Sequence, residues 1–485
     1  MGVLSELEPK KVFHYFEEIS RIPRPSYHEE KISDYLVEFA RARGLEYYQD
    51  ELKNVIIIKE AAPGYEDVEP LILQGHMDMV CEKEPGCTID FERDGLELCI
   101  EGDDITARGT TLGGDDGIAV AYALAILDSD DIPHPRLEFI CTVAEEVGMD
   151  GAMGLDVSML KGRKLLNLDS EEEGIMLVSC AGGCSAQCIL PMEWEQVSGQ
   201  KMTIEVSGLK GGHSGTEIDK GRANANVLMG RILLELEGSF PYRIVSLAGG
   251  SKDNAIPRES RVQLVLPDHM AAQMSEQTAQ IAETLCREYS TSDPDICVKV
   301  TGDEAQGVDT EVSALTESKS HQAVALLNIL PNGIQRMSDD IRGLVETSLN
   351  LGVLLLKEDE LSLRYAVRSS VGSAKEYLLR QLSLITGEMG GNMACSGNYP
   401  AWEYRKDSVL REDMIRIFQE MYGREPQVEA IHAGLECGIL AGKIEDLDCV
   451  SIGPDMQGVH TTEEKLSISS TRRTWDYVLR VIACK

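Results

Sequence analysis

The first third of the chain alternates between short apolar runs and longer amphipathic segments. The apolar runs of strand length are 54–59, 71–73, 137–143 and 165–168. Apolar positions recur at helical spacing over 27–42 and 118–127, and residues 1–21 have the pattern of an amphipathic helix. Strands that alternate with helices predict a mainly parallel sheet with helices on both faces. Nearly every polar cluster follows the end of one of these strands, which is the edge where open α/β sheets bind ligands.

The middle of the chain has a different pattern from about Cys188 onward. Apolar and polar positions alternate there, as expected of strands with one buried and one solvated face. A strand–strand–helix–strand order is predicted at 242–300 and again at 344–397, so this segment is expected to contain two related halves. The α/β pattern returns after Pro400. We therefore predict one α/β domain, residues 1–186 and 400–485, interrupted by an inserted α+β domain, residues 187–399.

Composition and charge narrow the possible functions. The 485 residues include 46 Lys or Arg and 82 Asp or Glu, giving a net charge of −36. Such an acidic chain should repel phosphate backbones and anionic membranes but attract cations, so neither nucleic acid nor a membrane is an expected partner. No apolar run reaches the roughly 18 residues of a membrane span, and the first helix lacks the apolar core of a signal peptide. Thirteen scattered cysteines indicate reduced thiols and a cytoplasmic protein.

Acidic residues and histidines gather where the predicted strands end. They are His76, Asp78, Asp115, Asp116, Glu145, Glu146, Asp169 and His460. Taken singly, each is more often an ordinary surface or core residue than a ligand. Taken together at one sheet edge, they would repel one another strongly unless cations neutralised them. Mixed imidazole and carboxylate ligands suit Zn²⁺, Mn²⁺ or Co²⁺, and a pair of such ions needs one bridging carboxylate.

The motifs around these residues resemble those of the dinuclear M20 metallopeptidases. The matching segments are Gly75-His76-Met77-Asp78, Gly114-Asp115-Asp116-Gly117, Glu145-Glu146-Val147-Gly148, Asp169 and His460. Within M20 the chain is most similar to the aminoacyl-histidine dipeptidase group (peptidase D, Xaa-His dipeptidase), which also has segments like 207–215, 221–226 and 432–436. The motifs follow the family order over essentially the whole chain, and Ala119 stands where relatives often have glycine. The resemblance implies a zinc-peptidase catalytic domain interrupted by a lid domain.

The resemblance also implies a role for each residue of the cluster. The expected metal ligands are His76 and Asp169 for one ion, Glu146 and His460 for the other, and Asp115 as the bridge. Zn²⁺ is the first expectation, and Mn²⁺ and Co²⁺ stay open. Asp78 is expected to accept a hydrogen bond from the His76 ring and fix its tautomer. Glu145 is expected to be the general base, taking a proton from the metal-bridging water and delivering it to the leaving amine. The peptide bond from Asp115 to Asp116 is expected to be cis.

Three residues of the inserted domain are implied by the same resemblance. His213 is expected to stabilise the tetrahedral oxyanion. Asn254 and Arg368 are expected to bind the C-terminal carboxylate of the substrate, for which a planar guanidinium is well suited. Without the resemblance, Asn254 is a turn residue and Arg368 a strand residue. By the same resemblance, a homodimer through the lid domain is expected as an alternative to a monomer.

The expected function is hydrolysis of unblocked dipeptides, including Xaa-His substrates similar to carnosine, by a dinuclear-metal dipeptidase. One alternative is an aminotripeptidase or an N-acyl-amino-acid deacylase on the same metal site. The two-part inserted domain favours the dipeptidase, because it can close over a short substrate. The other alternative is a non-catalytic metal or peptide carrier, which the presence of Glu145 and all five predicted ligands disfavours.

Overall fold

The computed structural model describes residues 2–302 and 311–485, which form two compact units. The first unit comprises the chain up to Cys180, Tyr404–Ala430 and Leu435–Lys485, and the second comprises Ala181–Glu403 and Ile431–Gly434. The second unit begins earlier than the predicted residue 187, because β9 (Gly182–Pro191) pairs along its length with β20 (Glu360–Ser369). The short segment Ile431–Gly434 belongs to the second unit because the amide of Ala181 donates hydrogen bonds to the carbonyls of Ile431 and Ala433.

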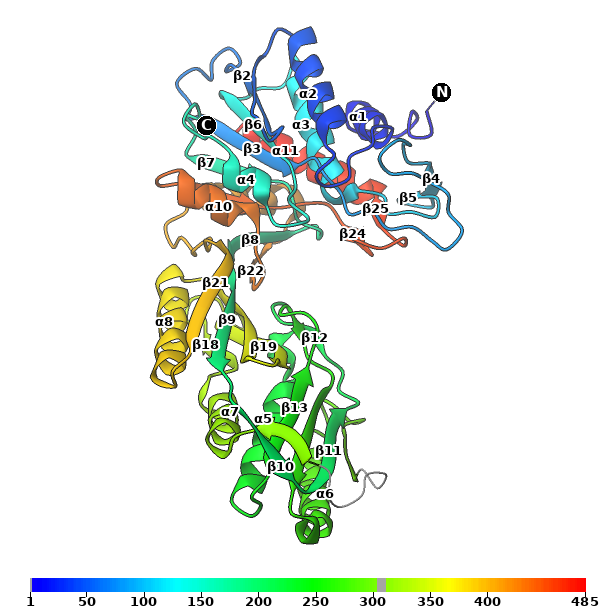
Figure 1. Ribbon diagram of the computed structural model, residues 1–485. Helices are drawn as coiled ribbons and strands as arrows, with labels where there is room; N and C mark the ends of the chain where they lie inside the picture. Colours follow the sequence, from blue (N-terminus) through cyan, green and yellow to red (C-terminus); the bar gives the residue numbers. More distant parts are fainter. Residues whose placement is uncertain (1, 303–310) are drawn as a thin grey trace. The chain divides into compact units, whose positions relative to one another are not determined.

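An eight-stranded sheet runs through the first unit in the order β1-β2-β6-β3-β7-β23-β8-β22 (Figure 1). Its strands are β1 (Glu46–Gln49), β2 (Val55–Lys59), β3 (Leu71–His76), β6 (Leu137–Thr142), β7 (Lys164–Asn167), β8 (Ile175–Cys180), β22 (Gln427–Ile431) and β23 (Asp448–Ser451). The four central strands, β6, β3, β7 and β23, are parallel to one another. β1, β2 and β8 pair antiparallel at the flanks. The mainly parallel sheet predicted from the sequence is therefore confirmed, with antiparallel flanks that the sequence pattern did not predict.

Both faces of this sheet are buried, because alternate residues of a strand point to opposite faces. Leu71 and Leu73 of β3 pack in one large apolar cluster, whereas Ile72 between them is buried outside it. Helices in the cluster are α1 (Lys10–Ser20), α2 (Glu30–Ala42), α3 (Gly114–Leu127), α9 (Val409–Tyr422) and α11 (Ile468–Ile482). Outside it, α10 (Glu436–Lys443) contacts α4 (Asp150–Gly154), β8 and β23. Burial on both faces explains why these strands read as continuous apolar runs.

A small four-stranded sheet completes the first unit in the order β24-β25-β5-β4. Its strands are β4 (Leu98–Glu101), β5 (Asp104–Ala107), β24 (Met456–Gln457) and β25 (Lys465–Ser467). Leu466 of β25 pairs with Ile105 of β5, so this sheet anchors both ends of the loop between β24 and β25. That loop carries His460. The sequence pattern did not predict these strands, which are too short for a periodicity.

The second unit contains an antiparallel sheet in the order β16-β11-β15-β13-β19-β20-β9-β21, with β18 paired to β19. Its further strands are β11 (Gln200–Ser207), β13 (Arg243–Gly249), β15 (Ser260–Leu266), β16 (Cys297–Gly302), β18 (Gly333–Met337), β19 (Val345–Leu356) and β21 (Asn392–Tyr399). Two small sheets pair β10 (Trp194–Ser198) with β17 (Glu311–Leu315) and β12 (Gly212–His213) with β14 (Ala255–Ile256). The helices are α5 (Ala225–Glu237), α6 (Ala271–Glu288), α7 (Glu317–Ile329) and α8 (Gly372–Glu388), with short 3-10 turns at Ile218–Lys220 and Asp268–Met270.

The strand order of this sheet shows two related halves. The predicted strand–strand–helix–strand runs are present as β13, β15, α6 and β16, and as β19, β20, α8 and β21. Each half also contains one further strand. In the first half β11 lies between β15 and β16, and in the second half β9 lies between β20 and β21. The two halves meet at β13 and β19, and their strand orders mirror each other. The strand that completes the second half, β9, precedes the first half in sequence, which is why the repeat read from the sequence was incomplete.

Two predicted helix boundaries were wrong. α1 begins at Lys10 rather than at the start of the chain, because Pro9 at its N-cap has an extended backbone (φ −78°, ψ 127°). α2 begins at Glu30 rather than Tyr27, because Tyr27 has a left-handed φ of 66° that a helix does not accommodate. The helix α7 was not predicted.

The expectations for thiols and membrane spans can also be compared with the structure. All thirteen cysteines lie within the described residues, and none of them forms a disulfide. None of the helices in residues 2–302 and 311–485 combines the length and the apolar composition that crossing a bilayer requires.

Candidate metal centre

The ends of three parallel strands deliver four of the predicted site residues to one edge of the first sheet. His76 is the last residue of β3, Glu145 and Glu146 follow the end of β6, and Asp169 follows the end of β7. Ala144, directly before the two glutamates, has a left-handed φ of 53°. This conformation turns the chain sharply and costs about 1–3 kcal/mol of conformational free energy. Residues in such conformations are common at functional sites. Since the carboxyl ends of neighbouring parallel strands share one edge, these side chains converge.

Asp115 lies between the two histidines. Its Oδ1 is 3.0 Å from Nε2 of His76, and its Oδ2 is 3.2 Å from Nε2 of His460. Asp115 stands in the first turn of α3 with a non-helical backbone (φ −80°, ψ 110°), and its peptide bond to Asp116 is cis, as the resemblance implied. One carboxylate oxygen facing each imidazole is the arrangement that a carboxylate bridging two ions requires.

The other predicted ligands divide between the two histidines. Both oxygens of Glu146 contact Nε2 of His460, at 3.1 and 2.9 Å. Asp169 Oδ1 is 3.8 Å from Nε2 of His76. Asp115, Glu146 and His460 offer three ligand atoms within 4.8 Å of one another. The structure therefore brings together all five residues predicted as metal ligands.

Asp78 links His76 to the segment that carries the two glutamates. Its Oδ1 is 3.3 Å from Nδ1 of His76, on the ring nitrogen opposite the one that faces the cluster. The same Oδ1 accepts the backbone N–H of Glu145 at 3.1 Å, and Oδ2 accepts the hydroxyl of Ser26 at 2.8 Å and the N–H of Glu146 at 3.3 Å. One fully buried carboxylate thus orients the imidazole and fixes the backbone of both glutamates.

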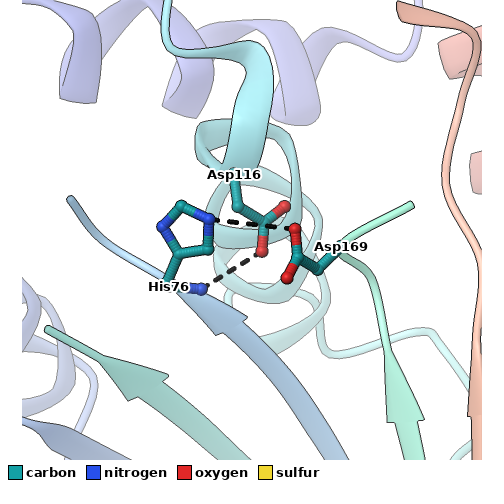
Figure 2. Close-up of side chains that lie close together, drawn as sticks. All are labelled: His76, Asp116 and Asp169. Carbon is teal, nitrogen blue, oxygen red and sulfur yellow. Dashed lines mark hydrogen bonds and ion pairs between the residues drawn. The ribbon is translucent and has the colours of Figure 1, made fainter. Parts of the chain in front are cut away.

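Asp116 is an acidic neighbour to which no role was assigned from the sequence. Figure 2 shows it beside His76 and Asp169, and these three residues also offer ligand atoms within 4.8 Å of one another. Its Oδ2 accepts the backbone N–H of His76 at 3.1 Å. Its Oδ1 is buried and has no hydrogen-bond partner within the described part of the chain. Because only Asp115 has one oxygen facing each imidazole, Asp115 fits the bridging position and Asp116 supports the end of β3.

The cluster carries more negative charge than its histidines balance. Burial raises the pKa of Glu145 to about 8 against the attraction of His76, and neighbouring carboxylates add to the rise. Burial and neighbouring carboxylates likewise raise the pKa of Asp169. Burial also acts to raise the pKa of Asp115, but hydrogen bonds from His460 and His76 hold it below its usual range. Divalent cations would relieve this repulsion, so the donor set and its charge fit a metal centre.

Two buried charged residues outside the cluster form hydrogen bonds with the backbone next to the site residues. Neither of them was predicted. Glu464 accepts hydrogen bonds from the three successive backbone N–H groups of Leu112–Gly114, at 2.7–3.0 Å, directly before Asp115. Arg24 donates to the carbonyls of Met77 and Asp78 at 3.2 and 3.1 Å. Both act on backbone far away in sequence, so no local motif signals them.

Glu436 is fully buried and braces the strands that carry the site. Its Oε2 accepts hydrogen bonds from Gln74 of β3 and Thr142 of β6, each at 2.6 Å. Burial raises its pKa to about 7. The motif that contains Glu436 was noted in the sequence, but its contacts with two strand ends were not foreseen.

In the second unit, His213 and Arg368 lie close together and Asn254 lies on a neighbouring segment. The strand β12, which contains His213, pairs with β14 directly after Asn254, and the amide of Ser214 donates to the Asn254 carbonyl at 2.8 Å. A Cβ on Gly215 would lie 3.0 Å from the His213 ring and 3.2 Å from Nε of Arg368. Burial and the charge of Arg368 lower the pKa of His213, which favours its neutral form. The Asn254 side chain is exposed.

Comparison with known proteins gives a consistent result. Residues 72–483 match the description "Peptidase family M20/M25/M40". The chain is 34% identical over 484 residues to the cytosol non-specific dipeptidase of Escherichia coli (strain K12), with 99% of each chain covered. Its structure is similar to that of aminoacylhistidine dipeptidase from Vibrio alginolyticus, with a TM-score of 0.92 and 36% identity over 99% of this chain and 97% of that one. Aminopeptidase PepT from Bacillus cereus, with a TM-score of 0.55 and 17% identity over 98% of each chain, shares the fold.

Proposed function

The chain belongs to peptidase family M20/M25/M40, and from this membership we infer that it is a metallodipeptidase acting on unblocked dipeptides. The relatives that match it over its full length are named a non-specific dipeptidase and an aminoacylhistidine dipeptidase. The observation that carries the proposal is Asp115, whose two oxygens face His76 and His460 next to the carboxylate of Glu146. This donor set suits two divalent ions held by one bridging carboxylate.

We propose that two divalent metal ions complete the site, with Zn²⁺ first and Mn²⁺ or Co²⁺ as alternatives. The proposed ligands are His76 and Asp169 for one ion, Glu146 and His460 for the other, and Asp115 for both. When bound, such ions lower the pKa of water and polarise a carbonyl oxygen. The proposal is supported by the imidazole and carboxylate donors and by the repulsion among the buried carboxyl groups.

Glu145 is proposed as the general base. Its backbone N–H is fixed by Asp78, and its carboxyl lies among the proposed ligands without being needed as one. A carboxylate there can accept the proton of an attacking water and later donate it to the leaving amine nitrogen. Asp78 also keeps the ring proton of His76 on Nδ1, which leaves Nε2 with its lone pair toward the cluster.

The proposed substrate class follows from the two relatives and from the second unit. We propose that the substrates are dipeptides of broad composition, including Xaa-His dipeptides. Arg368 and Asn254 would bind the substrate carboxylate, and His213 would donate a hydrogen bond to the oxyanion. A dipeptide places its carboxylate one residue beyond the scissile carbonyl, whereas a longer peptide would misplace it. A guanidinium can bind that carboxylate with two hydrogen bonds.

Turnover of a substrate panel tests the proposal. Dipeptides, tripeptides and N-acyl amino acids would be compared after reconstitution of the protein with Zn²⁺, Mn²⁺ or Co²⁺ in turn. The proposal requires the highest kcat/KM on free dipeptides. Faster tripeptide or acyl-amino-acid hydrolysis would support the aminotripeptidase or deacylase alternative. Bound metal without any turnover would support the carrier.

We further propose a homodimer formed through the second unit and action in the cytoplasm. The edge strand β21 has no charged residue along Asn392–Tyr399, and unprotected edge strands are able to pair with a second chain. The E. coli relative is named a cytosol enzyme. Light scattering coupled to size-exclusion chromatography would measure the oligomeric state, and a monomer at micromolar concentration would contradict the dimer.

Arg368→Ala is expected to raise KM for a dipeptide about ten- to a hundredfold, because a charge-assisted hydrogen bond to the carboxylate is lost. The same change should reduce the preference for a dipeptide over its C-terminal amide. Arg364→Ala is the matched control, since Arg364 is an exposed residue of the same strand β20. Steady-state kinetics on the acid and the amide measure both effects. If Arg368→Ala discriminates between them as sharply as the unmodified enzyme, Arg368 does not bind the carboxylate.

His213→Ala is expected to act on kcat rather than on KM. A donor that meets the oxyanion only in the transition state contributes nothing to binding of the ground state. Loss of one such donor typically lowers kcat about 10²–10³-fold. His269→Ala, at an exposed position of the same unit, serves as the control. A rise in KM of about the same size, with unchanged kcat, would instead assign His213 to substrate binding.

A further inference from the structure

Three buried hydrogen-bonding groups of the second unit lie without a protein partner. Nε of Arg368, Nδ1 of His432 and the hydroxyl of Ser214 have no hydrogen-bond partner among residues 2–302 and 311–485. Gly215, which follows Ser214 in the chain, packs closely against the other two residues: an added Cβ there would meet the backbone carbonyl of His432 at 2.5 Å and Nε of Arg368 at 3.2 Å. Buried polar groups left unpaired cost free energy. Nε–H of Arg368 and a protonated Nδ1 of His432 are donors, so a ligand that accepts hydrogen bonds would satisfy both.

His432 is held in this cluster by Ser348. The His432 side chain is 6% exposed, and its Nε2 is 2.8 Å from the hydroxyl oxygen of Ser348. In the register of β19 and β20, Ser348 stands directly opposite Arg368. Directly opposite residues of paired strands project from the same face of the sheet. The strand pair β19–β20 therefore holds the guanidinium of Arg368 and the imidazole of His432 at the same face of the sheet.

The loop that contains Asn254 is hydrogen-bonded to the strand β19. Asn350, two residues beyond Ser348 and so on the same face of β19, donates hydrogen bonds to the carbonyls of Asp253 and Ala255, each at 2.9 Å. The strand pair β19–β20 thus positions every second-unit residue proposed to bind the substrate carboxylate, together with His432.

We propose that His432 binds the C-terminal carboxylate of the substrate, donating a hydrogen bond from Nδ1–H beside the guanidinium of Arg368. With the Ser348 hydroxyl donating to Nε2, the neutral ring carries its proton on Nδ1. A carboxylate has enough lone pairs to accept from a guanidinium and an imidazole together. This inference rests on the proposed dipeptidase function and adds a specificity-determining residue to it.

The electrostatic surroundings of His432 agree with a neutral donor. Burial lowers its pKa to about 3, and the charges of Arg368 and His213 act in the same direction. The Asp219 carboxylate and the Val345 carbonyl act to raise the pKa of His432, but burial and the two neighbouring charges outweigh them. Val345 completes no hydrogen bond to Nδ1. The ring therefore offers one N–H at neutral pH without adding a second cation next to Arg368.

Two amide replacements separate the two ring nitrogens. Asparagine places its amide nitrogen near the position of Nδ1, and glutamine places its amide near that of Nε2. In His432→Gln the contact with Ser348 is retained and the Nδ1 donor is lost. In His432→Asn the donor is retained and the contact with Ser348 is lost. The readout is the ratio of kcat/KM for alanyl-alanine to that for alanyl-alaninamide, together with inhibition by free alanine and by alaninamide.

For His432→Gln we expect the acid-to-amide ratio to fall about tenfold, the smaller end of the range for a hydrogen bond to a charged group. Inhibition by alanine should weaken similarly, while inhibition by alaninamide should not change. His432→Asn should keep the ratio within about threefold of the unmodified enzyme. His269→Gln, exposed in the same unit, is the control.

An unchanged ratio in His432→Gln, or an equal fall in both variants, would overturn the assignment of Nδ1 as a carboxylate donor. Thermal melts show whether the variants are folded. If both unfold, Ser348→Ala takes their place, since it removes the group that fixes the tautomer, and an unchanged ratio there would also overturn the proposal. Failure of the dipeptidase proposal itself is seen separately, as absence of dipeptide turnover by the unmodified enzyme.

Discussion

Glu145→Gln is expected to lower kcat about 10²–10⁴-fold, the usual contribution of a general base. The amide keeps the shape of the side chain but cannot accept a proton. The backbone of residue 145 is held by its N–H bond to Asp78, which the substitution leaves in place. The fold and the metal content should therefore not change, and KM should change little.

Stopped-flow or steady-state kinetics on one dipeptide, with metal analysis of the same sample, measure this effect. Glu51→Gln is the matched control, because Glu51 is an exposed glutamate of the same unit. Retention of near-normal kcat by Glu145→Gln would assign the proton transfer to another group, with Asp78 the next candidate. Loss of metal in this variant would instead make Glu145 a ligand.

Asp115→Ala is expected to reduce the tightly bound metal below two ions per chain and to abolish nearly all turnover. The reason is geometric: its two oxygens face different imidazoles, at 3.0 and 3.2 Å, so no other side chain of the cluster can take its place. Even loss of a residue that only supports a ligand commonly costs 10–100-fold in metal affinity or activity. Removal of the shared ligand should cost more than about a hundredfold.

The metal content of dialysed Asp115→Ala, measured by plasma mass spectrometry, tests the assignment directly. Thermal melts with and without added Zn²⁺ provide a second readout, because a ligand that binds only the folded state raises its stability. Asp67→Ala, an exposed residue of the first unit, is the control. Two tightly bound ions in Asp115→Ala would contradict the bridging role. Chelation of the unmodified enzyme should abolish activity, and readdition of a suitable divalent ion should restore it.

The geometry of the metal centre also explains why sequence analysis assigned no role to Asp116. Asp115 and Asp116 are adjacent acidic residues in one glycine-flanked motif, and nothing local distinguishes which of them faces the histidines. Their roles differ because the backbone leaves the helix at both residues, with ψ values of 110° and 34°. That backbone turns Asp115 toward both imidazoles and Asp116 toward the amide of His76.

The amino-acid sequence by itself determined the α/β character of the first unit, its interruption by a second one, and the residues proposed to hold metal. These features are local. A strand buried on both faces must be apolar along its length, and a residue placed at the end of such a strand reaches the ligand-binding edge whatever the order of the strands. His76, Glu145, Glu146 and Asp169 could therefore be proposed as site residues before any contact was known, and the resemblance to the M20 metallopeptidases implied which of them hold metal.

Only the tertiary structure decided which distant residues support that edge. Glu464, Arg24 and Glu436 act through hydrogen bonds to backbone or side chains that are remote in sequence. β9 joins a half of the second sheet whose other strands lie more than 150 residues later. His432 reaches Arg368 through Ser348 and a strand register. A hydrogen bond depends on distance and direction in space, and in these cases neither is encoded by spacing along the chain.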